Sequence, residues 1–158
     1  MKKTISALAL ATFLASPALA QQDTHKKDED HMSLSVSAVG IGVTDLDTSM
    51  AFYSGVLGMK SLVSYELDYM NEIVLMPPDG GSALVLMQYT DGIERNVKNL
   101  PIKLVYRTSD PKALAQKIRD SGYEIVREPG PAEEVGGAVV GFAKGPDGYL
   151  IEILPTRN

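Results

Sequence analysis

The chain has 158 residues, of which 15 are basic and 20 acidic, so its formal net charge is −5. An acidic chain gains little from binding polyanionic DNA and is repelled by anionic lipid surfaces, which makes both poor candidates for partners. There is no cysteine. Catalysis by a Cys–His pair is therefore excluded, and stability in an oxidising compartment must come from packing.

The first 20 residues have the pattern of a secretory signal peptide. Lys2 and Lys3 give a positive start, residues 5–14 are apolar at all but two positions, and Ala18-Leu19-Ala20 supplies an A-x-A cleavage site. The apolar run is too short to span a membrane. We expect export to the periplasm or the medium, with a mature chain of 13 basic and 20 acidic residues and a net charge of −7.

Residues 21–34 are expected to form a flexible linker, because no side chain between Gln21 and His31 is apolar. Both histidines, His25 and His31, lie in this stretch. A segment without a scaffold cannot hold a coordination geometry, so a solvated tail is favoured over a metal site. Residues 35–156 have the length of one domain with a core of its own.

Within that domain the same order of features occurs twice, over about 35–92 and again over about 100–156. Equivalent landmarks recur at nearly constant separations. Asp45 and Asp110 are 65 residues apart, Gly58 and Gly122 are 64 apart, and Pro78 and Pro146 are 68 apart. A constant offset across three kinds of landmark indicates an internal duplication.

In the first copy, alternation of small and apolar residues predicts a strand over 35–43. Apolar residues at helical spacing predict a helix over 46–57, which ends at Gly58. Strands are predicted over 62–67, 73–76 and 83–89, with a Pro-Asp-Gly turn before the last.

The second copy repeats this order. A strand over 102–106 is followed by a helix that begins after Asp110, has Pro111 in its first turn and ends at Gly122. Strands are predicted over 124–127, 138–143 and 149–154. Each copy is thus a β-α-β-β-β module, and the fold class is α+β.

Two motifs within these modules resemble a known family. They are VTDL…FY…VLGM over residues 43–59 and GPDGYLIE over residues 145–152. They resemble the vicinal oxygen chelate superfamily, which includes glyoxalase I, extradiol dioxygenases and bleomycin-resistance proteins. The resemblance covers about residues 35–155. It implies that the two modules form a concave mixed sheet around a cavity, with the helices outside, but one fold hosts unrelated chemistries.

Metal-using members of that family place a ligand on the inner face of four strands, usually His, Glu, His and Glu. Carried over one position at a time, these ligands fall on Ala38, Leu86, Lys103 and Glu152. Only Glu152 is a residue that binds metals, and a single carboxylate does not make a Zn²⁺ or Ni²⁺ site. The resemblance therefore implies neither a metal nor another cofactor for this chain.

The same register predicts which side chains surround the cavity, because alternate residues of a strand share a face. Lys103 stands where the metal would be and is predicted to pair with Glu152, since a buried carboxylate without a partner is costly. Alternatively, Lys103 lies at the rim and reaches water. The predicted pocket residues are Ala38, Gly40, Leu84, Leu86, Gln88, Lys103, Val105, Arg107, Leu150 and Glu152.

Two functions from different classes follow. The first is a binding protein for a small, partly apolar molecule. The second is a glyoxalase I-type, lactoylglutathione lyase-like lyase or isomerase, either with an unorthodox metal site or without metal and with Glu152 and Lys103 as acid and base. Export argues against the second, because the thiol adducts used by glyoxalase I arise mainly in the cytosol. The sequence leaves open whether one chain or a homodimer closes the cavity.

Overall fold

The computed structural model describes residues 35–157, which belong to one compact unit that begins at Ser35. The predicted signal peptide and linker lie outside the described residues. Among the described helices, none is long and apolar enough to cross a membrane.

The first module contains four strands and one helical segment, in the predicted order. Its strands form a sheet in the order β1-β4-β3-β2, in which β1 runs parallel to β4 and the other pairs are antiparallel. The elements are β1 (Ala38–Gly42), α1 (Leu46–Met50), η1 (Ala51–Val56), β2 (Lys60–Leu67), β3 (Met70–Met76) and β4 (Ala83–Tyr89).

The second module repeats this topology in a sheet of its own, ordered β5-β8-β7-β6. The expected mixed sheet is thus present as two four-stranded sheets. The elements are β5 (Lys103–Thr108), α2 (Pro111–Asp120), β6 (Ile125–Ala132), η2 (Glu133–Val135), β7 (Ala138–Lys144) and β8 (Leu150–Pro155). The parallel pair again joins the first and last strands, β5 and β8.

Each helix begins at the aspartate that the sequence predicts. The Asp45 carboxylate accepts a hydrogen bond from the Thr48 N–H at 2.8 Å, and the Asp110 carboxylate accepts one from the Ala113 N–H at 2.9 Å. The hydrogen bonds from Thr48 lower the pKa of Asp45. These caps satisfy amide groups that have no partner within the helix.

The first helix differs from the prediction in its second half, where η1 is a π-helix. The Leu57 N–H reaches back five residues to the Phe52 carbonyl, at 3.0 Å. The wider turn allows the adjacent residues Phe52 and Tyr53 both to be buried, together with Val56. Gly58 follows with a φ of 78°, as expected for the residue that ends a helix.

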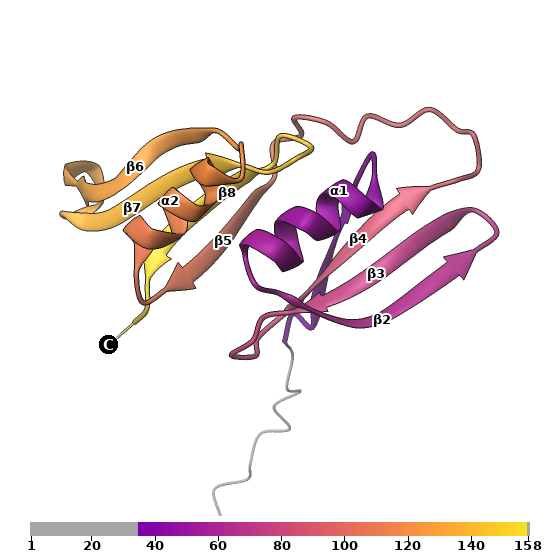
Figure 1. The fold of residues 1–158 in the computed structure, drawn as a ribbon, viewed down its shortest axis with the longest axis horizontal. Helices are drawn as coiled ribbons and strands as arrows, with labels where there is room; N and C mark the ends of the chain where they lie inside the picture. Colours follow the sequence, from indigo (N-terminus) through magenta and orange to yellow (C-terminus); the bar gives the residue numbers. More distant parts are fainter. Residues whose placement is uncertain (1–34, 158) are drawn as a thin grey trace, which may run out of the picture. The chain divides into compact units, whose positions relative to one another are not determined.

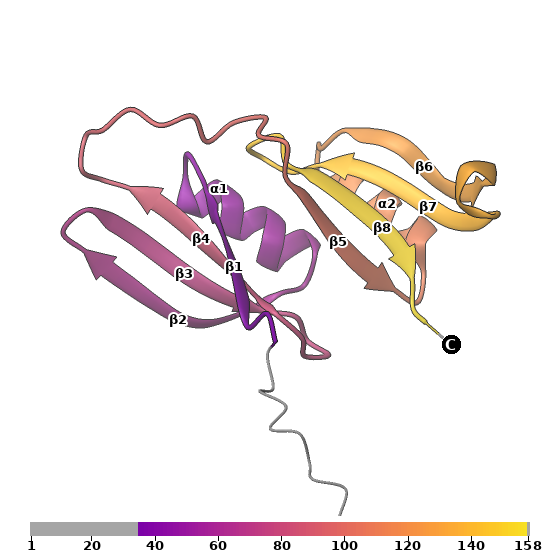
Figure 2. The same cartoon turned by 180° about the vertical axis from the view of Figure 1, so that it is seen from behind.

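Each sheet has one face covered by helix, called here the helix side, and an opposite open side. In Figure 1 the helices lie in front of the strands, and in Figure 2 the strands of both modules lie in front of the helices. The hydrophobic core lies on the helix side and includes residues of both modules. Phe52 of η1, for example, packs edge-on against the ring of Tyr123, with centroids 4.6 Å apart.

A polar contact, called here the closed seam, also joins the modules. Asp147, in the turn before β8, accepts hydrogen bonds from the Thr44 N–H at 3.0 Å and the Thr44 hydroxyl at 2.6 Å, with the Ser49 hydroxyl at 3.4 Å. The Tyr149 hydroxyl donates to the Gly42 carbonyl at 2.5 Å. Asp147 is only 3% exposed, so module 2 holds a buried carboxylate that module 1 satisfies.

Candidate functional site

The ion pair predicted between Lys103 and Glu152 is present. The Lys103 Nζ lies 2.6 Å from Glu152 Oε2, with the lysine side chain 50% exposed and the glutamate side chain 13% exposed. Val105 pairs with Glu152 across the parallel strands β5 and β8. The carboxylate is therefore largely withdrawn from water, while the ammonium group extends toward solvent. This arrangement lies between the two alternatives that the sequence leaves open, a buried pair and a lysine at the rim.

Five of the predicted pocket residues share the open side of the second sheet. Their neighbours on β5 and β8 are core residues of the helix side, including Ile151, Ile153 and Leu104. Arg107 lies at the end of β5 and donates from its guanidinium to the Pro155 carbonyl at 2.7 Å. The five residues are Lys103, Val105, Arg107, Leu150 and Glu152.

The face predicted for β4 is wrong by one residue, although Leu84 lines the cavity described below. Leu84 and Leu86 are buried core residues on the helix side, where Leu86 pairs with Ile41 of β1. Gln88 follows on the same side, and its side-chain amide donates to the Thr44 carbonyl at 3.0 Å. The open side of β4 instead carries Val85.

The cause is a turn that is one residue longer in module 1. Two positions separate Asp147 from the first residue of β8, whereas three separate Asp79 from the first residue of β4. The sheet registers pair Val85 with Gly40 and Glu152 with Val105, so Val85 is the structural counterpart of Glu152. The second ligand position that the resemblance implies therefore moves from Leu86 to Val85.

Ala38 and Gly40 lie on the open side of β1, as predicted, but the space over the glycine is occupied. A Cβ placed on Gly40 would lie 3.0 Å from the Met87 methyl group. Met87 is on β4, on the same side of the sheet. Its flexible thioether therefore covers the part of β1 that lacks side chains.

The positions that the resemblance implies as metal ligands carry one carboxylate. They are Ala38, Val85, Lys103 and Glu152, and the Lys103 ammonium already pairs with the Glu152 carboxylate. Zn²⁺ and Ni²⁺ sites need several nitrogen or oxygen donors at defined positions. No group of three or more His, Cys, Asp or Glu residues within 35–157 has a geometry that could hold a metal ion.

A cavity of about 830 Å³ lies beside the ion pair, between β5 of module 2 and the edge of module 1. Its apolar walls include Val39, Leu57, Met59, Leu84, Leu104 and Leu114, and its polar groups include Asp79, Lys103, Arg107, Thr108 and Ser109. Small-molecule sites commonly occupy about 300–1,000 Å³ and combine apolar walls with a few polar groups. Of the predicted pocket residues, Leu84, Lys103, Val105 and Arg107 line this cavity.

Tyr106 also lines the cavity, and its side chain ends in a hydroxyl group. Its hydroxyl lies 3.6 Å from the Met59 sulfur, and burial raises its pKa well above the usual range. Burial raises the pKa of Tyr53 in the same way, and within residues 35–157 the Tyr53 hydroxyl has no hydrogen-bond partner. Both hydroxyls therefore stay protonated at neutral pH.

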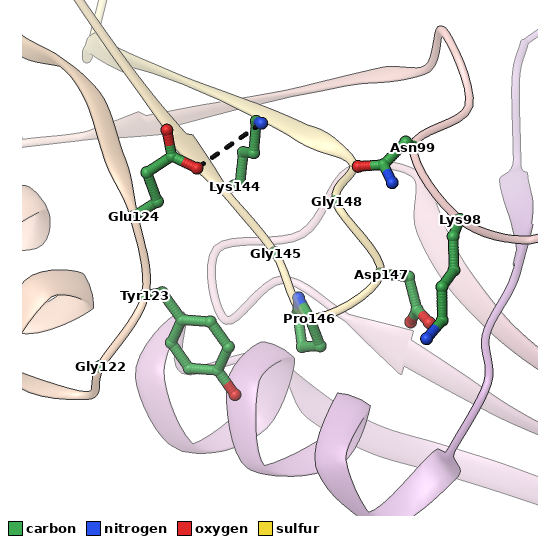
Figure 3. A pocket seen from close by; sticks show the side chains of 10 residues that line it. All are labelled: Lys98, Asn99, Gly122, Tyr123, Glu124, Lys144, Gly145, Pro146, Asp147 and Gly148. Carbon is green, nitrogen blue, oxygen red and sulfur yellow. Dashed lines mark ion pairs between the residues drawn. The ribbon is translucent and has the colours of Figure 1, made fainter.

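A second, smaller hollow of about 300 Å³ surrounds the turn that carries Asp147 (Figure 3). Its lining is mostly polar and includes Lys98, Asn99 and the Glu124–Lys144 ion pair, whose charged atoms are 3.5 Å apart. Because Asp147 is already satisfied within the closed seam, this hollow offers less binding chemistry than the larger cavity.

Sequence reasoning missed the residues that form the helix-side wall of the cavity and the closed seam. Val39, Leu57 and Leu114 have the apolar spacing of ordinary core residues, and nothing in their pattern distinguishes a cavity wall. The role of Asp147 could have been inferred from the repeat. Asp147 and Asp79 are equivalent, but only Asp147 has both a threonine and a serine, Thr44 and Ser49, as partners in the other module.

Comparisons of the sequence and of the structure with known proteins point to the same family. The sequence profile of the Glyoxalase/Bleomycin resistance protein/Dioxygenase superfamily matches residues 35–153. A lactoylglutathione lyase of Salmonella typhimurium is 31% identical over 120 residues, which cover 73% of this chain and 88% of that protein.

A lactoylglutathione lyase of Arabidopsis thaliana is 32% identical over 133 residues, or 82% of this chain, but the match spans only 45% of the plant protein. Among solved structures, the trypanothione-dependent glyoxalase I of Leishmania major superposes with a TM-score of 0.63 at 28% identity. That match covers 78% of this chain and 87% of the Leishmania chain.

Proposed function

Because the chain belongs to the glyoxalase/bleomycin resistance protein/dioxygenase superfamily, we propose that it is an exported member that binds a small, partly apolar molecule between its two modules. The cavity carries this proposal. It has about 830 Å³ of space, mainly apolar walls, and two cations on one strand, Lys103 and Arg107. This combination suits a ligand that is held by contact area and oriented by a few polar groups.

The proposal includes the absence of a catalytic metal at the family position. The Lys103–Glu152 pair supports this, because the ammonium group supplies the positive charge that the carboxylate would otherwise take from a metal. With Ala38 and Val85 at the other two positions, no further donor is available. Metal-dependent turnover would then need a donor set other than the family's.

A lyase or isomerase remains the second candidate, favoured by the names of the relatives. Proteins named lactoylglutathione lyase are about 30% identical to this chain. Glu152 is present at its family position and lies beside Lys103, so the two groups could exchange a proton with a bound substrate. Such a reaction would use these two residues without the remaining family ligands.

One preparation separates the two functions. The chain from Gln21, purified without a histidine tag, is assayed for bound Ni and Zn and for formation and cleavage of lactoylglutathione, with and without added metal. We expect well under one equivalent of metal and no turnover. About one tightly held equivalent together with turnover would contradict the proposal and establish the lyase.

Binding is tested on the same preparation with a library of small apolar and amphipathic compounds, scored by the rise in melting temperature. Val39→Phe puts a larger side chain into the cavity and should reduce the rise, because Val39 lines the cavity and is 42% exposed. The matched control Leu62→Phe lies outside the lining, on an exposed position of β2, and should leave the rise intact. Equal effects of both variants would refute the site.

Export and self-association complete the proposal. Export rests on the sequence of residues 1–20 and is tested by recovering, outside the cytoplasm, a chain whose mass begins at Gln21. A homodimer is proposed because large apolar side chains such as Tyr65, Leu67 and Val105 are exposed on the open sides of the sheets. Light scattering should give the mass of two chains, and the mass of one chain would contradict the dimer.

A further inference from the structure

The internal duplication provides a comparison within the molecule, because each contact between the modules has an equivalent place on the other side. At the closed seam, Asp147 of module 2 sits on the loop before α1 of module 1, where Thr44 donates two hydrogen bonds to its carboxylate. The offsets of the repeat make Asp79 the counterpart of Asp147 and Ser109 the counterpart of Thr44. The place where Asp79 would meet Ser109 is called here the open seam.

The open seam is part of the large cavity. Asp79 and Ser109 both line it and both are exposed, whereas Asp147 is 3% exposed. Within residues 35–157, no hydrogen bond engages the Ser109 hydroxyl or the Ser109 N–H. The loop before α2 therefore keeps the two donor groups that its copy before α1 uses to hold a carboxylate.

Sequence differences explain why the second seam does not close. Ser49, which directs its hydroxyl toward Asp147, is replaced at the equivalent position by Leu114. Tyr149, whose hydroxyl holds the Gly42 carbonyl, has no aromatic counterpart in the longer turn, which continues as Gly80-Gly81-Ser82. The open seam thus lacks counterparts of two contacts that join the modules at the closed seam, and the space between the modules stays open.

We propose that the cavity takes a ligand with an apolar body and one carboxylate, and that this carboxylate lies on Ser109 as the Asp147 carboxylate lies on Thr44. This inference rests on the proposed binding function and assigns its ligand class. The Ser109 N–H and hydroxyl donate to the acid, and Arg107, on the strand that leads to Ser109, supplies positive charge. The Lys103 ammonium is already paired with Glu152. A neutral ligand would leave the two Ser109 donors unused.

The remaining walls fit the apolar part of such a ligand. Val39, Leu57 and Leu104 line the same cavity, and Leu114 stands where the closed seam has a serine. Asp79 is exposed and also lines the cavity, and its carboxylate disfavours a second negative charge on the ligand. Asp110 does not compete with the ligand for the Ser109 donors, because its carboxylate already accepts a hydrogen bond from the Ala113 N–H. The cavity therefore suits a monoacid rather than a diacid.

The test uses the chain from Gln21 and a matched pair of probes, 4-phenylbutyrate and its amide, in titrations followed by ¹⁵N–¹H NMR. The acid should bind at least about tenfold more tightly than the amide, the effect of one charge-assisted hydrogen-bonded group. It should also shift the Ser109 amide resonance, while the Thr44 resonance stays in place.

Variants assign the effect to individual groups. Ser109→Ala removes one donor and should weaken the acid about fivefold, and Arg107→Gln should weaken it by a similar factor, with little change for the amide. Lys60→Gln removes an equal charge from β2, outside the cavity lining, and should change neither probe. Variant spectra that keep the dispersion of the parent confirm that each variant is folded.

The possible failures are distinct. If acid and amide bind equally and both shift cavity resonances, the carboxylate assignment is wrong and the proposed binding function stands. If the acid shifts resonances around Asp147 and Lys98 instead, the site is the smaller hollow and the inference is also wrong. If neither probe shifts any cavity resonance, the inference is contradicted, and the compound library then decides the proposed binding function separately.

Discussion

The two partners of the Lys103–Glu152 ion pair are unequally exposed, and this decides what the pair contributes to stability. Glu152 is mostly withdrawn from solvent, while half of the Lys103 side chain is in water. An exposed pair is worth about 0–1 kcal/mol, and removing one partner from a fully buried pair costs about 3–5 kcal/mol. The geometry here lies nearer the exposed limit, because water can still solvate the ammonium group.

We therefore expect Lys103→Met to lower the free energy of unfolding by about 1 kcal/mol. Urea denaturation measures this change in the free energy of unfolding. Lys144→Met is a matched control, because Lys144 pairs with Glu124 at 3.5 Å and both side chains are exposed, so its effect should be near zero. Adding Glu152→Met to Lys103→Met should recover most of the loss. A loss equal to that of the control would show that Glu152 needs no partner.

Among the structural elements, β4 shows where sequence reasoning succeeds and where it stops. The eight strands found within residues 35–157 were all predicted in the right order, because turns, capping aspartates and apolar runs mark them clearly. The face of β4 could not be predicted, since ALVLMQY is apolar on both sides and its alternation carries no information about register. The alternation in β5 and β8 places lysine, arginine and glutamate on one side, and there the prediction holds.

The corrected register predicts opposite effects for neighbouring substitutions. Leu86→Glu puts a carboxylate into the core, where Leu86 is fully buried, and should cost several kcal/mol or prevent folding. Val85→Glu places the same group on the open side, where we expect a loss of about 1 kcal/mol or less. Circular dichroism and urea denaturation compare them. A stable Leu86→Glu protein with an unfolded Val85→Glu protein would restore the register first predicted.

The two Pro-Asp-Gly turns allow a similar comparison. Asp147→Ala removes a buried carboxylate and leaves the Thr44 donors without their acceptor, so we expect a loss of about 2–4 kcal/mol. Asp79→Ala changes the exposed copy of the same residue and should alter the free energy of unfolding by less than about 0.5 kcal/mol. Thermal and urea unfolding measure both. Comparable losses would mean that the open seam is held by Asp79.

For the molecule as a whole, the buried tyrosines set a limit to stability at high pH. Burial raises the pKa of Tyr53, Tyr106 and Tyr149, so the folded state favours their protonated form. An acid whose pKa is raised by folding contributes stability below its unfolded pKa, about 10 for tyrosine, and this contribution falls as the pH rises above that value. The melting temperature should therefore decline steeply above about pH 10.

Absorbance at 295 nm gives the matching titration, because the chain has seven tyrosines and no tryptophan to obscure them. A fraction of the tyrosines should ionise only as the protein unfolds, and Tyr106→Phe should reduce that fraction and soften the decline in melting temperature. Ionisation of all seven near pH 10 in the folded protein would contradict the burial of Tyr53 and Tyr106.

The closed seam also affects the energetics of binding at the cavity. A ligand that must first bring two lobes together loses part of its affinity to the free energy of closure. Here the Asp147 contacts and the shared core join one module to the other, so we expect the modules to need little rearrangement on binding. Binding then needs to order only the ligand and a few side chains, and this preorganisation lowers the entropic cost of association. A modest contact area can in this way support selective capture.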